Sequence, residues 1–320
     1  MNEDRIDALL RGHVPAIDEA AEERARRRLR AAIDRELAPV RDRGGKIVWA
    51  VAVAALVSVL VGLQILLPPG PGGPARGAAE EIRRLGQISR AQPVVVAGRS
   101  DYFYRRYEQL GVEAGGSSES EYNLSVRVSV ESWLRSDGSG ARATTYKQVG
   151  FVSSLDRENW LQEGGPIPAT GDVKTERFQE GGLSVYPVED LPSDPNALRR
   201  VIDGGSVITP GEGSAGLLST IGLLLAQQDL SPDLRQGLFE VAATIPDVSV
   251  QADALDPIGR IAEAVIATDA SGDFTLYFDP SDARILGWSS DHLAYQGHPA
   301  YTEWVVYLDA DVVRRIPRPL

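Results

Sequence analysis

The sequence predicts an α+β protein in which a short cytoplasmic helix and one transmembrane helix precede a large exported domain. Three observations lead to this prediction. The run from Ile47 to Leu67 is apolar apart from Ser58 and Gln64. Basic residues are frequent before this run, and none follows it until Arg76. Farther along the chain, segments with the two-residue period of strands flank a block that carries helix-start signals.

The apolar run sets the predicted membrane topology. A helix of this length rises about 30 Å, which matches the hydrocarbon core of a bilayer. Because basic residues stay on the cytoplasmic side, the N-terminus should lie in the cytoplasm and the bulk of the chain outside. A cleaved signal peptide is the alternative, but it would be shorter and nearer the N-terminus. We therefore predict a single-pass protein of the cell membrane with a cytoplasmic helical segment (1–46), a transmembrane helix (47–67), a Pro/Gly linker (68–77) and an extracytoplasmic domain (78–320).

Composition excludes several classes of function. The chain has no cysteine, which excludes disulfides, thiolate metal sites and a cysteine nucleophile. The formal net charge of -12 falls almost entirely on the predicted outer part. An acidic surface repels phosphate backbones, so we expect no nucleic-acid partner.

The cytoplasmic segment contains a helical pattern over Glu19–Leu37, with a thin apolar stripe beside clustered arginines. One interpretation is a juxtamembrane stalk whose arginines contact anionic lipid. The other is a helix that docks its stripe into a cytosolic partner. In the second case the candidate partner-binding residues are Leu29, Ile33, Leu37, Arg24 and Arg28.

The outer domain should begin with a short helix over 78–91 and continue with strands. Residues 122–134 alternate apolar and polar side chains, as in a strand with one face on a core. The turn 136–140 should connect this strand to a returning strand over 142–151.

Three helices should follow, and each has a start signal. Asp194-Pro195 and Ser231-Pro232 combine an N-cap residue with proline at the first helical position, and Ser214 should begin the helix between them. Strands are then predicted over 261–268, 273–278, 285–293 and 301–313.

No motif indicates catalysis. Residues 211–216 match G-x-G-x-x-G, but Pro210 interrupts the approach and the following helix leads into another helix, so we interpret the match as a glycine-rich helix start. A G-x-S-x-G nucleophile elbow is missing from the sequence. We predict a protein that is not an enzyme, with no catalytic residues and no cofactor.

Two groups of side chains are candidates for metal binding. His292 and His298 are too few for a zinc site, and we assign them to a surface turn. Asp309 and Asp311 should share one strand face, with Asp253 and Asp256 in another segment. Calcium is conceivable there, but a solvated acidic edge is the simpler interpretation, so we predict no metal.

Four segments together carry a family resemblance: Leu191-Pro192-Ser193-Asp194-Pro195, Asp256-Pro257-Ile258-Gly259-Arg260, Phe278-Asp279-Pro280 and Ile285-Leu286-Gly287. In this order they resemble the LPxDPxxL, DxxGR and FDP...LG motifs of a family of uncharacterised actinobacterial single-pass membrane proteins. Each segment also has a structural explanation as a helix start or a turn, and Gly259 should supply a positive φ.

The resemblance implies an anti-sigma-factor-like layout with an exported sensory domain. It also implies a curved sheet packed by about three helices, similar to a lipoprotein-carrier half-barrel. The chain lacks the His-x3-Cys-x2-Cys zinc motif of the best-known anti-sigma heads. We favour a transmembrane regulator whose cytosolic partner is a sigma factor. The alternative is a membrane-anchored module that binds an envelope lipid or lipoprotein and does not signal.

Overall fold

The computed structural model describes residues 76–95, 97–98, 100–116, 121–182, 188–205, 213–227, 230–270, 272–294 and 299–317. The predicted cytoplasmic segment and transmembrane helix, and linker residues 68–75, lie outside this set. Among the residues that are described, no helix is long and apolar enough to cross a membrane.

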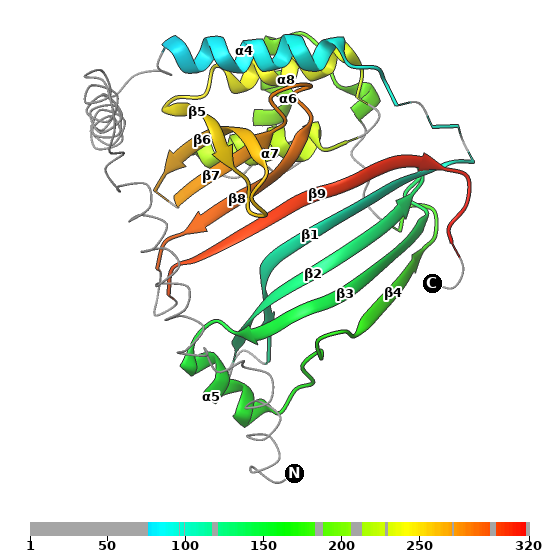
Figure 1. Cartoon of the computed structure of the whole chain (residues 1–320), viewed down its shortest axis with the longest axis vertical. Coiled ribbons are helices and arrows are strands. Elements are labelled where there is room, and N and C mark those ends of the chain that lie inside the picture. Colours follow the sequence, from blue (N-terminus) through cyan, green and yellow to red (C-terminus); the bar gives the residue numbers. More distant parts are fainter. Residues whose placement is uncertain are drawn as a thin grey trace, which may run out of the picture. The chain divides into compact units, whose positions relative to one another are not determined.

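The described part of the chain is an α+β domain built on one large, curved antiparallel sheet (Figure 1). Its strand order is β4-β3-β2-β1-β9-β8-β7-β6-β5. The strands are β1 (Tyr102–Gly115), β2 (Tyr122–Leu134), β3 (Gly140–Phe151), β4 (Val173–Phe178), β5 (Val248–Leu255), β6 (Ile261–Asp269), β7 (Gly272–Phe278), β8 (Ile285–His292) and β9 (Tyr301–Val313).

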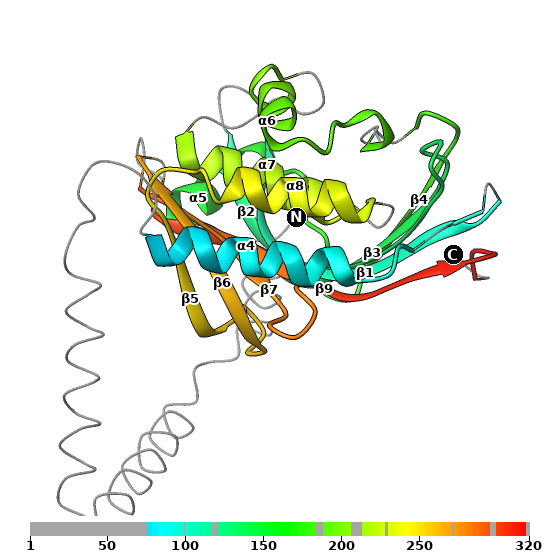
Figure 2. The same ribbon diagram turned by 90° about the horizontal axis from the view of Figure 1, so that it is seen from above.

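Helices cover the part of the sheet that contains β5 to β8, while the long strands β1 to β3 and β9 extend beyond the helical layer (Figures 1 and 2). The helical elements are α4 (Arg76–Ala91), α5 (Ser154–Glu163), the 3-10 helix η1 (Val188–Asp190), α6 (Pro195–Asp203), α7 (Gly213–Leu225) and α8 (Pro232–Ala242).

Two of the predicted helix starts are confirmed at the level of atoms. The Asp194 side chain accepts a hydrogen bond from the Ala197 backbone N–H at 2.9 Å, and Pro195 is the first residue of α6. The Ser231 hydroxyl accepts one from Leu234 N–H at 3.2 Å at the start of α8. In each case the side chain satisfies an N–H group that has no partner inside the helix.

Helix α7 begins differently from the prediction. It starts at Gly213, which has a φ of 75°, and its N-terminal cap comes from another element. The Asp269 carboxylate of β6 accepts a hydrogen bond from Ala215 N–H at 3.1 Å, whereas the Ser214 hydroxyl donates to Pro246 O. The prediction of Ser214 as the cap was therefore wrong, because a carboxylate distant in sequence takes that role.

The predicted strands all form, and four further elements, α5, β4, η1 and β5, were not predicted. Strand β4 is mostly exposed and β5 contains a bulge, so neither has a clear two-residue alternation. Helix α5 has no continuous apolar face; it is held by its Ser153 N-cap and by Trp160, which packs on Phe151. These elements depend on contacts that local periodicity does not show.

The main core lies between the helices and the face of the sheet that they cover. Its largest fully buried side chains include Leu218 and Ile221 of α7, Leu238 and Phe239 of α8, and Leu276 of β7. Phe239 also contacts Phe278 of β7, with ring centroids 5.2 Å apart. Burying each such side chain contributes about 1.5–3 kcal/mol, so this cluster holds the helical layer on the sheet.

Arginines of helix α4 form ion pairs with α8 and with β6. Arg83 pairs with Glu240 of α8 at 3.0 Å, and Arg90 pairs with Asp233 at 2.9 Å. Arg84 hydrogen-bonds both Glu81 of its own helix and Glu263 of β6. Glu263 is only 3% exposed, so Arg84 connects α4 to a buried carboxyl of the sheet.

We predict that Glu263→Gln stabilises the protein at high pH. Burial raises the pKa of Glu263, so the protonated carboxyl is favoured in the folded state. The stability that this group contributes is present below about pH 4.5 and is lost as the pH rises through its folded pKa. Because glutamine resembles the protonated form, the variant's Tm should equal the wild-type Tm near pH 4 and exceed it by about 2–4 °C at pH 8.

Thermal melts of both proteins across this pH range provide the measurement. Glu240→Gln is the matched control, because the Glu240–Arg83 pair is exposed and should show no such trend. A Tm difference that shrinks as the pH rises would contradict the prediction.

Candidate functional site

A cavity of about 330 Å³ lies between the helical layer and the sheet, where α4 and α7 end and α8 begins. The turn between β7 and β8 and the middle of β9 complete its wall. This volume is at the lower end of the range of about 300–1,000 Å³ that small-molecule pockets occupy.

Apolar side chains make up much of the wall. Leu230 and Phe278 are buried, and Tyr307 presents its ring from β9. Val95, which follows α4, also lines the cavity but is 43% exposed, so it marks the opening to solvent. The remaining apolar lining residues are Pro93, Leu225, Ala226, Ala283, Ile285, Leu308 and Ala310. Such a wall favours an apolar chain over a polar solute.

Arg105 enters this wall from β1. One of its terminal NH₂ groups donates a hydrogen bond to Ala226 O at the end of α7. Its guanidinium lies 5.3 Å from the centroid of the Tyr307 ring, which is a cation–π distance. Burial raises the pKa of Tyr307, so the phenol is neutral and offers its ring face but no charge.

Arg235 enters from the first turn of α8. Its NH₂ donates to Gln92 O at 2.6 Å, but its Nε is buried and has no acceptor within the described residues. A buried donor without a partner costs about 1–3 kcal/mol. Burial lowers the pKa of Arg235, but an arginine remains charged in proteins.

The carboxylates around the cavity do not neutralise these two arginines. Asp282 accepts from the Arg284 backbone N–H at 2.8 Å and is 4.0 Å from its side chain, so this pair cancels within one turn. Asp309 pairs in register with Arg106, not with Arg105. Successive residues of a strand point to opposite faces and cross-strand partners share a face, so Asp309 and Asp311 project away from the Arg105 side. Within the described part of the chain, no carboxylate lies within 4.0 Å of the nitrogens of Arg105 or Arg235.

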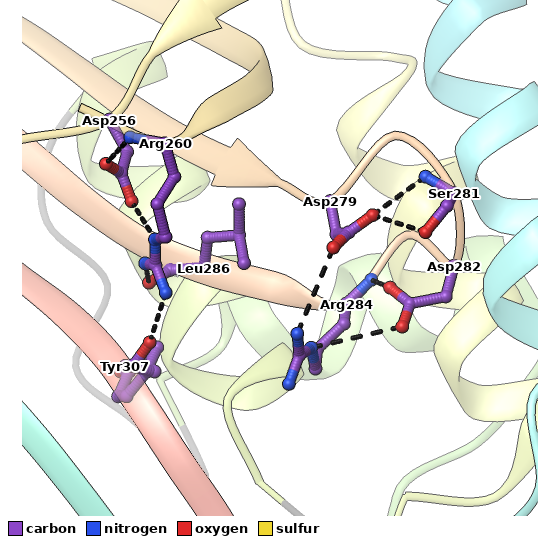
Figure 3. Close-up of polar contacts among 8 residues, drawn as sticks. All are labelled: Asp256, Arg260, Asp279, Ser281, Asp282, Arg284, Leu286 and Tyr307. Atoms are coloured by element: carbon purple, nitrogen blue, oxygen red, sulfur yellow. Dashed lines mark hydrogen bonds and ion pairs between the residues drawn. The ribbon is translucent and has the colours of Figure 1, made fainter. Parts of the chain in front are cut away.

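A second arginine system holds the backbone of this wall. Arg260, in the turn between β5 and β6, pairs with Asp256 at 2.6 Å and donates to Leu286 O and Tyr307 O, each at 2.9 Å (Figure 3). We call these four residues the Arg260 network. Strands β8 and β9 both carry register shifts at these points. A bulge leaves ladder groups unpaired, so one guanidinium serves carbonyls at two bulges.

The turn residues of the family resemblance have structural roles in the Arg260 network or in turns close to it. Gly259 has a φ of 86°, which confirms the predicted positive value. The Asp256 carboxylate also accepts from Ile258 N–H at 3.1 Å and Arg260 N–H at 2.8 Å. Asp279 accepts from Ser281 N–H and hydroxyl in the turn between β7 and β8 (Figure 3). These residues form turns, as their structural explanation predicted.

The acidic edge was only partly predicted. Asp309 and Asp311 share a strand face, as expected. They pair in register with Arg106 and Tyr104 of β1, respectively. The assignment of Asp256 to a solvated edge was wrong, because its side chain is 0% exposed and is held by Arg260. Among the residues that the structure describes, no group of three His, Asp or Glu side chains could hold a metal ion.

The contacts of His292 and of Gly213 give each residue a structural explanation. His292 is the last residue of β8; its Nε2 is 3.3 Å from Glu303, and its ring stacks on Tyr301. His298 lies outside the described residues, as do Gly211 and Glu212. Gly213 needs its lack of a side chain, because a Cβ there would lie 2.5 Å from the Asp269 carboxylate.

The partner-binding residues predicted from sequence, Leu29, Ile33, Leu37, Arg24 and Arg28, all lie outside the described residues. Arg105 and Arg235 were not predicted. Arg105 stands next to Arg106 in an aromatic-rich strand, and only the strand register shows which of the two faces the helices. Arg235 follows Leu234 on α8 without any pattern that separates it from a surface arginine.

Comparison with known proteins adds little to these observations. No protein-family model and no curated protein matches the chain. The chain is similar to a crystal structure described as a candidate outer membrane lipoprotein-sorting protein domain from Vibrio parahaemolyticus. That similarity has 9% sequence identity, 75% coverage of this chain, 95% coverage of the other and a TM-score of 0.20. A TM-score this low carries no argument about fold or function.

We predict that Arg260→Met lowers the free energy of unfolding by about 3–5 kcal/mol, because it leaves the buried Asp256 charge without a partner. Arg284→Met is the matched control. Arg284 also lies in a hairpin turn beside aspartates, but its side chain is 61% exposed and its closest carboxylate is 3.9 Å away. Its loss should cost about 0–1 kcal/mol.

Urea unfolding monitored by tryptophan fluorescence measures both effects. Equal losses for the two variants would show that the Arg260 network does not hold the sheet.

Proposed function

We propose that the outer domain is a non-enzymatic binding module that accepts the apolar chain of a lipid or of a lipid-modified protein. The observation that carries this proposal is the cavity of about 330 Å³ between the helices and the sheet. Its apolar wall and its opening at Val95 suit an acyl chain that enters from solvent.

The architecture supports the same proposal. A curved sheet with helices over part of one face (Figure 2) is the arrangement expected of a lipoprotein-carrier half-barrel. The cavity lies where α4 and α7 end and α8 begins. We propose that the domain works outside the cytoplasm on a chain anchored by the 47–67 helix. The sigma-factor interaction remains a prediction about residues outside the described part.

The test is photocrosslinking of the full chain with a photoactivatable monoacylglycerol, a neutral probe with one acyl chain. We expect crosslinked peptides from the cavity wall, in 225–235 and 278–285, because the acyl chain should displace water there. Peptide mass spectrometry locates the crosslinks.

A variant that fills the cavity serves as the negative control. Ala226→Trp places a large ring where Ala226 now lines the cavity, and it should reduce these crosslinks at least about fivefold. Leu255→Trp is the matched control, because it introduces the same residue at a position that is 63% exposed and does not line the cavity. Crosslinking of this variant should match that of the wild type. Crosslinks confined to the 47–67 segment, with none in the cavity wall, would overturn the proposal.

A further inference from the structure

The two cavity arginines indicate more than an apolar ligand. Arg105 comes from β1 and Arg235 from α8, which are far apart in sequence. Both residues line the same cavity. Each donates to a backbone carbonyl at a helix end, Ala226 O and Gln92 O respectively. These carbonyls are uncharged acceptors, so neither positive charge has a carboxylate partner among the residues that the structure describes.

The surrounding acidic groups leave this charge in place. Of the acidic residues that line the cavity, Asp282 is paired with Arg284, and the Asp309 and Asp311 side chains project to the opposite face of the sheet. Among the described residues, the wall of the cavity therefore has two cations without a carboxylate partner, in a chain whose net charge is -12. The net negative charge of the protein repels free anions. The two arginines in the cavity therefore favour an anion that also carries an apolar chain, because the apolar wall attracts that chain.

We propose that the cavity selects an anionic amphiphile, with an oxyanion headgroup held by Arg105 and Arg235 and an apolar chain against Phe278 and Ile285. This inference rests on the proposed function, because it names the ligand class of the same cavity. Arginine presents planar pairs of N–H donors that match a phosphate or carboxylate. Each guanidinium uses one terminal NH₂ group for a helix-end carbonyl, and its remaining N–H donors are the ones that such an oxygen could accept from.

The headgroup is tested by competition against the photoactivatable monoacylglycerol, using two amphiphiles with the same chain. Dodecyl phosphate and dodecylphosphocholine, both at monomeric concentrations, differ only in the headgroup and its net charge. We expect dodecyl phosphate to compete at least about tenfold more strongly, as two charge-assisted contacts imply. Inorganic phosphate alone should not compete, because it lacks the chain.

Variants assign this preference to the two arginines. Arg105→Gln and Arg235→Gln should each reduce the preference for dodecyl phosphate about fivefold or more, while the monoacylglycerol still crosslinks. Arg105→Lys and Arg235→Lys should retain part of the preference, because they keep the charge and lose the planar pair of donors. Arg177→Gln removes the same charge from an exposed position on β4 and should leave the preference unchanged. Thermal melts confirm that each variant is folded.

The outcomes separate the two proposals. If the monoacylglycerol does not reach the cavity, the proposed function fails. If it does and the two dodecyl amphiphiles compete equally, the function stands and the headgroup inference is wrong. Competition by inorganic phosphate as strong as that by dodecyl phosphate would show that the site binds free anions and not amphiphiles. A Gln variant that keeps the full preference would remove that arginine from the headgroup site.

Discussion

The Arg260 network is the interaction on which the shape of this domain depends. Strands β8 and β9 carry bulges, and a bulge leaves backbone groups without ladder partners. Arg260 donates to the carbonyls of Leu286 and Tyr307 at these two points, and the buried Asp256 holds the guanidinium in place. Because Ile285 and Tyr307 line the cavity, the turn between β5 and β6 also positions the wall of the candidate site.

Much of the fold was predictable because its signals are local. Asp194-Pro195 and Ser231-Pro232 act as predicted, since a cap needs only N–H groups of the next turn. The alternation of β2 was equally reliable, because one of its faces is buried along its whole length. The features that were missed depend on distant residues. Helix α7 is capped by Asp269 of β6, and β5 is interrupted by a bulge at Asp253, which has a φ of 53°.

The cavity could not be predicted, because residues from seven separated elements and their connecting turns line it. A change of strand register by one residue would exchange Arg105 for Arg106 at the cavity wall, and neither residue carries a local signal for its side. Among the described residues, the motifs of the family resemblance stabilise turns and helix starts. The positive charge in the cavity comes from arginines outside those motifs, so architecture and ligand chemistry are encoded in different parts of the sequence.

The charge in the cavity has a cost that argues for a ligand. Within the described part of the chain, two half-buried guanidinium groups lack carboxylate partners and one has a buried donor that makes no hydrogen bond, which costs stability. Elsewhere this chain neutralises such groups: Arg127 has Glu108, Arg142 has Glu176 and Arg260 has Asp256. With a net charge of -12, the chain has enough acidic residues to pair with Arg105 and Arg235 as well. In the proposal above, an anionic headgroup would supply the counter-charge that the described residues do not provide.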